Sequence, residues 1–249
     1  MTHSLAIAIG LIALPGAVLA ASKTYEVGHF EGVAVAAGII ADIKLGTPQS
    51  VVAETSGSNF DDLTISVDGN VLRIGRPLSS WVMPIHPEYH VHITVPVLHS
   101  LDASSGGGVS VNGTPEGDFA AAASSGGGIQ LSAVKGGNLS IAASSSGGVR
   151  LAAFSGGSVI THASSGGSVS VAGSCGSFSA SASSGGDITA RDLKCESVVA
   201  EASSGGDISA FASKSITGHA SSGGDIRVAG KPPVVQVSES SGGAVAVEK

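Results

Sequence analysis

A short motif, Ala-Ser-Ser-Gly-Gly, recurs with small variations from residue 103 to the end of the chain. Its eight copies begin at Ala103, Ala123, Ala143, Ala163, Ala182, Ala202, Ala220 and Glu239. Neighbouring copies are therefore 18 to 20 residues apart. A repeat of this length indicates one small structural unit stacked on copies of itself, because each unit alone is too small to bury its apolar residues.

Two short strand-like segments flank each copy of the motif. Apolar and polar residues alternate in both, as in a β-strand with one buried side. Val109 and Val111 show this after the first motif, and Phe119 and Ala123 show it before and at the second. We therefore predict an all-β fold: a right-handed parallel β-helix with about 20 residues per coil, in which equivalent residues form columns spaced by about 4.8 Å. A β-propeller would need blades of about 40 residues.

The composition agrees with such a fold and excludes others. Glycine accounts for 37 of the 249 residues and can take up positive φ angles at tight corners. Hydrophobic residues make up 42% and charged residues only 12%, which does not fit a disordered chain. The net charge of −7 disfavours nucleic-acid binding, which requires a basic surface.

The N-terminus carries an apolar run of about fifteen residues, 5–19, followed by Ala20 and Ala21. That length is short for a membrane span and typical of the core of a signal peptide. We predict a signal peptide over residues 1–21; a retained N-terminal anchor is the alternative, since no Lys or Arg precedes the run. The mature chain would then be one exported β-solenoid domain, residues 22–249, that does not span the membrane.

Residues 22–102 are strand-like but irregular, and we expect them to form less regular coils on the same core. A hairpin turn is predicted at Asp68-Gly-Asn. The order of several segments resembles the auto-transporter adhesins with a head GIN domain. These segments are Phe30-Glu-Gly-Val-Ala-Val, Gly38-Ile-Ile, Leu63-Thr-Ile-Ser-Val and Val91-His-Ile-Thr-Val-Pro. The Gly-Ile-Asn that names the family is Gly-Ile-Ile here. The resemblance implies an exported, all-β, β-helical protein of cell-surface type and supplies no catalytic residues.

The two cysteines, Cys175 and Cys195, each lie seven residues ahead of the opening Ala of a repeat. They should therefore occupy the same column in neighbouring coils, with Cα atoms about 5 Å apart, which is within disulfide range. Because export implies an oxidising compartment, we predict a disulfide. Two packed, reduced thiols are the alternative.

Two groups of residues could bind a metal ion. His90 and His92 would face the same side of a strand, with His86 nearby, as in some zinc or copper sites; exposed strand histidines are the alternative. Three aspartates, Asp187, Asp207 and Asp225, each follow a Gly-Gly pair and should stack in one column. This Asp column could be a solvated corner, a calcium site or the acid–base pair of an enzyme.

The remaining candidates offer weaker support for chemistry. Ser203 and Ser204 loosely resemble a nucleophile motif, but the same serines occur in most copies, which indicates a structural turn. Trp81 and Tyr89 lie in or beside the stretch with the most aromatic residues and prolines outside the repeats. These rings could stack on a sugar, or they could cover the open end of the solenoid.

The sequence predicts a non-enzymatic, adhesin-like protein of the periplasm, the cell surface or the medium, without a cofactor. It would offer a flat face of the solenoid to a glycan or to a cell-envelope protein. The alternatives are a polysaccharide-cleaving β-helix enzyme that uses the Asp column, and a purely structural or ice-binding solenoid. The C-terminal end, near Glu248 and Lys249, carries no evident cap, and we expect it to be a possible site of self-association.

Overall fold

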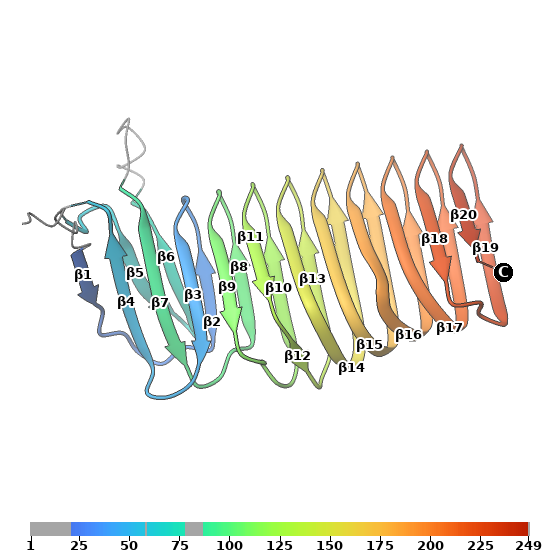
Figure 1. Ribbon diagram of the computed structural model, residues 1–249. Coiled ribbons are helices and arrows are strands. Elements are labelled where there is room, and N and C mark those ends of the chain that lie inside the picture. Colours follow the sequence, from blue (N-terminus) through green and yellow to red (C-terminus); the bar gives the residue numbers. More distant parts are fainter. Residues whose placement is uncertain (1–20, 58, 78–86, 249) are drawn as a thin grey trace, which may run out of the picture.

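The computed structural model describes residues 21–57, 59–77 and 87–248. These residues form strands joined by turns and loops, and none of them lies in a helix long and apolar enough to cross a membrane. The strands build one elongated β-solenoid (Figure 1). This confirms the predicted all-β solenoid with about 20 residues per coil. The predicted signal peptide lies, except for Ala21, outside the described residues.

Each coil contributes one strand before its Ser-Ser-Gly-Gly turn and one strand after it, so two sheets result. The pre-turn sheet contains β8 (Ser100–Ala103), β10 (Phe119–Ala123), β13 (Leu139–Ala143) and β19 (Val234–Glu239). The post-turn sheet contains β9 (Gly108–Asn112), β11 (Gly128–Leu131), β18 (Asp225–Ala229) and β20 (Ala244–Val247). Four long strands run through the corner opposite the turn and belong to both sheets: β14 (Gly148–Ser164), β15 (Ser168–Ser183), β16 (Asp187–Ala202) and β17 (Asp207–Ala220).

Every strand of this region pairs in parallel with its equivalent in an adjacent coil. The short β12 (Val134–Lys135) lies at the corner opposite the turns and pairs with β14. In Figure 1 the post-turn strands lie nearer the viewer and run downward while the coils advance to the right, so the solenoid is right-handed.

Inward-pointing side chains form continuous columns along both sheets. The pre-turn column contains Phe119, Leu139, Val159, Phe178, Val198 and Ile216, each at most 3% exposed. The post-turn column contains Val109, Ile129, Val149, Val169, Ile188, Ile208 and Ile226 and is equally buried. Burial of these columns sets the register, because a shift of one residue would turn the polar rows inward.

The Ser-Ser-Gly-Gly segment forms a tight turn between the two sheets. In the copy that follows Ala202, the carbonyl of Ser203 accepts a hydrogen bond of 2.9 Å from the N–H of Gly206. The two central residues, Ser204 and Gly205, have φ angles of 49° and 71°. Positive φ at both central positions is the mark of a type I′ turn. The sequence predicted positive φ for glycine but not for serine, which takes it up less readily.

The last glycine of each turn is required for a different reason. A Cβ atom at Gly206 would lie 2.5 Å from the carbonyl carbon and oxygen of Ala182 in the preceding coil. The same obstruction recurs at the equivalent glycines Gly127, Gly147, Gly167, Gly186, Gly224 and Gly243. The turn therefore uses one glycine for its φ angle and the other for the close approach of stacked coils.

The N-terminal segments stack in an order that differs from their order in the chain. A first coil, β2 (Gly32–Val35) and β3 (Ile40–Leu45), lies directly against β8 and β9. The next coil in the chain, β6 (Val71–Gly75) and β7 (Tyr89–Val95), stacks in parallel on the outer side of the first.

Antiparallel strands close this end of the solenoid. They are β1 (Ala21–Thr24), β4 (Ser50–Thr55) and β5 (Thr64–Asp68). β4 pairs with β7, β1 pairs with β4, and β5 pairs with β6 through the predicted hairpin turn at Gly69. The sequence pattern indicated strands here but neither the reversed order of the coils nor the antiparallel cap.

Cys175 and Cys195 lie opposite each other in β15 and β16, in the register that the repeat predicts. The structure joins them in a disulfide, with 4.6 Å between their Cα atoms and 20 residues between them in the sequence. Both are buried. The bridge therefore links two successive coils from inside the core.

Thr161 interrupts the apolar columns. It points into the core between Ile141 and Ala180, and its buried hydroxyl has no hydrogen-bond partner among the described residues. An unpaired buried hydroxyl costs about 1–3 kcal/mol. We expect Thr161→Val, which keeps the shape of the side chain, to raise the free energy of unfolding by about 1 kcal/mol in a denaturant titration.

The matched control for this prediction is Thr217→Val. Thr217 lies on the same sheet but points outward and is exposed. Its replacement should change the free energy of unfolding by less than about 0.5 kcal/mol. Equal stabilisation by both variants would assign the effect to strand propensity, and a loss of stability at Thr161 would show that its hydroxyl is paired.

Candidate functional site: the outer faces of the solenoid

The outer face of the pre-turn sheet is flat because small side chains dominate it. The register aligns two outward rows across the coils. One row contains Ser100, Ala120, Ser140, Ile160, Ser179, Val199 and Thr217. The other contains Asp102, Ala122, Ala142, His162, Ser181, Glu201 and His219. We call these two rows the flat face. It offers hydroxyls and a few apolar side chains over the length of the repeat region.

A hollow of about 510 Å³ lies at the N-terminal end of the flat face. Its floor includes Ala34 of β2, which the register places between Arg73 of β6 and Asp102 of β8. Thr64 and Ser66 of β5 also line it. Partial burial raises the pKa of Asp102, and the nearby Arg73 lowers it by a smaller amount. The hollow thus presents a positive and a negative group on either side of a small residue, an arrangement suited to a polar ligand.

A second hollow, of about 330 Å³, lies on the same sheet near the corner opposite the turns. His99, Asp118, Asn138 and Ile160 contribute to its lining. The carboxylate of Asp118 accepts hydrogen bonds from the backbone N–H of Asn138 at 2.7 Å and from its side-chain amide at 3.2 Å. These bonds hold the polar groups of the second hollow in place.

The predicted histidines lie on the other face of the molecule. His90 and His92 point outward from β7 on the post-turn sheet, as the alternation predicts. Nδ1 of His92 is 3.9 Å from Asp42, and its Nε2 is 3.7 Å from Glu54. Within the described ranges, no group of three or more His, Cys, Asp or Glu side chains is arranged to hold a metal ion. His86 lies outside the described residues.

The Asp column has the register that the repeat predicts, with Asp187, Asp207 and Asp225 in neighbouring coils of the post-turn sheet. Arg227 lies beside two of them: its Nη1 is 3.6 Å from Asp207 and its Nη2 is 3.3 Å from Asp225. Thr189 donates a hydrogen bond of 3.0 Å to Asp187. A guanidinium of the protein therefore reduces the repulsion within the column.

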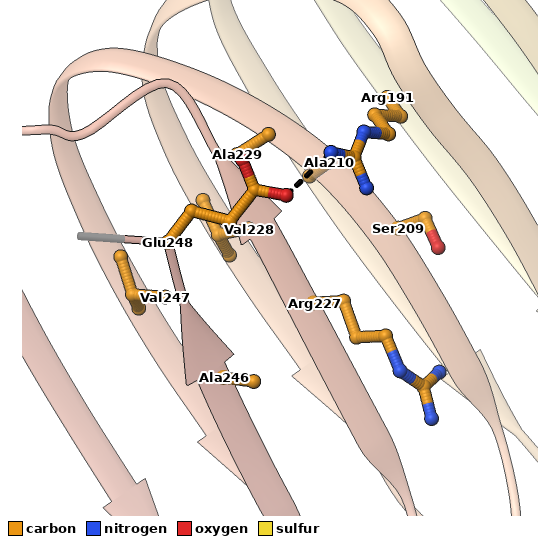
Figure 2. Close-up of a pocket in the computed structure, with 9 residues that line it drawn as sticks. All are labelled: Arg191, Ser209, Ala210, Arg227, Val228, Ala229, Ala246, Val247 and Glu248. Atoms are coloured by element: carbon orange, nitrogen blue, oxygen red, sulfur yellow. Dashed lines mark hydrogen bonds and ion pairs between the residues drawn. The ribbon is translucent and has the colours of Figure 1, made fainter.

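A third hollow, of about 230 Å³, lies beside the Asp column at the C-terminal end (Figure 2). Arg191, Ser209, Arg227 and Glu248 supply its polar lining. Figure 2 shows the guanidinium of Arg191 meeting the carboxylate of Glu248, with which it forms an ion pair. Both arginines are thus engaged by carboxylates. The arrangement is typical of a surface ion-pair network and does not favour an acid–base pair for cleaving a polysaccharide.

Tyr89 is buried, so its ring does not form an exposed platform for a sugar. Its hydroxyl donates a hydrogen bond to Asp62, and the guanidinium carbon of Arg76 lies 4.7 Å from the centre of its ring. Burial and the hydrogen bond to Asp62 raise the pKa of Tyr89 far above its usual value. Arg76 also pairs with Asp62. Trp81, the other predicted ligand-binding residue, lies outside the described residues.

The Arg76–Asp62–Tyr89 network holds the antiparallel cap against the N-terminal coils. Arg76 also donates hydrogen bonds to the carbonyl oxygens of Ala37, at 3.2 Å, and of Pro87, at 2.6 Å. Sequence reasoning missed this network, because charged residues outside a repeat give no signal that they are buried.

Residues 29–232 match the family described as putative auto-transporter adhesin, head GIN domain. The chain belongs to this family. Membership indicates an adhesin-like, non-enzymatic protein that is exported or located at the cell surface. The GIN segment of this family, Gly38-Ile39-Ile40 here, runs from the turn of the β2–β3 coil into β3: Ala37 and Gly38 are the central turn residues, with φ angles of 59° and 70°, and Ile40 begins the strand. The N–H of Gly38 donates to the carbonyl of Ser105 at 3.0 Å, so this turn begins the row of Ser-Ser-Gly-Gly turns.

Several solved structures have folds similar to that of this chain. A putative adhesin from Parabacteroides distasonis is 20% identical, with 92% of this chain and 97% of that chain covered and a TM-score of 0.79. A putative adhesin from Parabacteroides merdae is 16% identical, with 94% and 98% covered and a TM-score of 0.76. A putative lipid binding protein from Parabacteroides distasonis is 17% identical, with 92% and 97% covered and a TM-score of 0.72. These likenesses show the fold alone. No curated protein matches the chain.

Proposed function

We propose that this head GIN domain protein is an exported, adhesin-like binding protein that uses its flat face to hold a glycan or a cell-envelope protein. The observation that carries the proposal is the pair of continuous outward rows on the pre-turn sheet, in which small residues predominate, with a hollow at the N-terminal end and a second one nearby. A flat surface of this kind suits broad contact with an extended partner.

The chemistry of the flat face favours contact through shape and hydrogen bonds. Its two rows contain serine, threonine, histidine and alanine, the carboxylates of Asp102 and Glu201, and the apolar Ile160 and Val199, which are 43% and 46% exposed. Neither row contains Phe, Tyr or Trp, so the stacking of sugar rings would contribute little. Recognition would depend on serine hydroxyls and on the polar groups of the two hollows, with Arg73 and Asp102 orienting a charged or polar group of the partner.

The test compares two arginine substitutions at equivalent depth on opposite sides of the solenoid. Ala122 points outward from the flat face, and Ser170 points outward from the post-turn sheet; both are half-buried. The mature protein and both variants would be applied to a glycan array and to fixed bacterial cells. We expect Ala122→Arg to weaken binding at least tenfold, because its long charged side chain would hold a flat partner away, and Ser170→Arg to leave binding unchanged.

Three outcomes would contradict the proposal in different ways. Equal losses in the two variants would mean that binding does not depend on the flat face. A loss confined to Ser170→Arg would assign binding to the post-turn sheet. Absence of binding by the mature protein to both the array and the cells would overturn the adhesin-like function itself.

A further inference from the structure

The C-terminal end of the solenoid exposes side chains that are buried in every complete coil. Val235 and Val237 of β19 occupy inward positions, yet they are 45% and 46% exposed. Val235 aligns with Ile216 of the preceding coil, which is fully buried. Val235 therefore stands at the end of a core column, at a position where another coil would cover it.

Both strands of the last coil also have an open edge. Among the described residues, β19 pairs only with β17, and β20 pairs only with β18. The opposite end is different, because antiparallel strands cover its coils. Natural β-proteins cover or disrupt exposed edges, since unpaired backbone N–H and C=O groups recruit other strands. In the part of the chain that the structure describes, no other strand covers the C-terminal edge, and its two strands are apolar at alternate residues and contain no proline.

The two open strands complement each other in direction and in pattern. They run in opposite directions within the coil, because a turn at 240–243 joins them. Val235 and Val237 continue the inward positions of β19, and Val245 and Val247 do so in β20. In an antiparallel register that places Val235 opposite Val247 and Val237 opposite Val245, apolar side chains would meet apolar ones on the core side. Outside, Gln236 would lie opposite Ala246.

We propose that the C-terminal end binds the same end of a second copy of this chain around a two-fold axis that runs along the strands. Such a rotation exchanges the two sheets, so β19 of each copy meets β20 of the other and both run antiparallel. Each open edge gains a partner and the two apolar cores become continuous. The contact is self-complementary and closes after two copies, as in most symmetric dimers. It involves the end of the solenoid and leaves the flat face free, so it does not depend on the proposed function.

The first test is the molar mass of the mature protein in solution at micromolar concentrations, measured by light scattering during size-exclusion chromatography. We expect two copies for the native protein and one copy for Val237→Lys, since the lysine would place a charge in the apolar contact. Val199→Lys is the matched control, because Val199 is as exposed as Val237, at 46%, but lies on the flat face. It should remain a dimer. Because both valines are exposed, neither change should unfold the single chain, which circular dichroism would verify.

The second test examines the register. Gln236→Cys combined with Ala246→Cys should form a covalent dimer under mild oxidation, whereas Gln236→Cys alone should not, because its two copies would lie on opposite sheets. A native protein with the mass of one copy would overturn the proposal. Species larger than two copies would overturn the closed two-fold arrangement, and efficient cross-linking by the single-cysteine variant would overturn the pairing of β19 with β20.

Discussion

Gly206→Ala is expected to lower the free energy of unfolding by about 3 kcal/mol, near the upper end of the range for overpacking. The added Cβ atom would lie 2.5 Å from the carbonyl group of Ala182, which is backbone of the preceding coil. That carbonyl cannot easily move, because it accepts a hydrogen bond of 2.9 Å from the N–H of Ser203 in the ladder between the coils. The two coils would have to separate. Denaturant titration followed by circular dichroism would measure the loss.

The neighbouring glycine provides the control. Gly205 has a φ of 71°, but a Cβ atom there would meet nothing within 4 Å. Gly205→Ala should therefore cost only the strain of positive φ, about 1 kcal/mol. The prediction is that Gly206→Ala lowers the free energy of unfolding more than Gly205→Ala does, although the two glycines are adjacent in one turn. Equal losses at the two glycines would mean that backbone conformation, and not the spacing of the coils, limits this position.

The regular half of the fold could be predicted because the motif fixes both a period and a phase. Counting from the opening alanine of each repeat places Cys175 against Cys195 and Asp187 against Asp207, and the structure pairs both sets as counted. The outward direction of His90 and His92 follows from alternation along one strand in the same way. The register of the repeats and the direction of these side chains follow from local periodicity, which can be seen in one sequence without a structure.

The N-terminal part could not be predicted because its order depends on pairings between distant segments. β2 pairs with β8, which lies almost 70 residues later in the chain. No local sequence pattern in either strand indicates which strand it pairs with. The partly buried network of Arg76, Asp62 and Tyr89 could not be predicted for the same reason, because packing between distant segments decides whether a charged group is buried. The sequence allowed Tyr89 either to stack on a sugar or to cover the end of the solenoid, and the burial of its ring excludes an exposed platform.

Removal of the Cys175–Cys195 bridge is expected to lower the free energy of unfolding by about 3 kcal/mol. The bridge closes a loop of 20 residues, and cross-linking a loop of that size restricts the unfolded chain by roughly this amount. The double variant Cys175→Ala with Cys195→Ala isolates this contribution. Alanine should fit at both positions, because the equivalent residues in the adjacent coils are also small: Gly156 pairs with Cys175, and Ala212 pairs with Cys195. The folded state should therefore tolerate the change, and denaturant titration of the native and double-variant proteins would measure the difference.

Reduction of the native protein gives an independent route to the same comparison. Because both cysteines are buried, a reductant should act slowly on the folded protein and quickly once denaturant opens the coils. Native protein unfolded and refolded with reductant should match the double variant in stability, whereas the double variant should not respond to reductant. If the exported protein, alkylated without reduction and analysed by mass spectrometry, carried labels on both cysteines, the bridge would be absent and the stability difference would have to come from core packing alone.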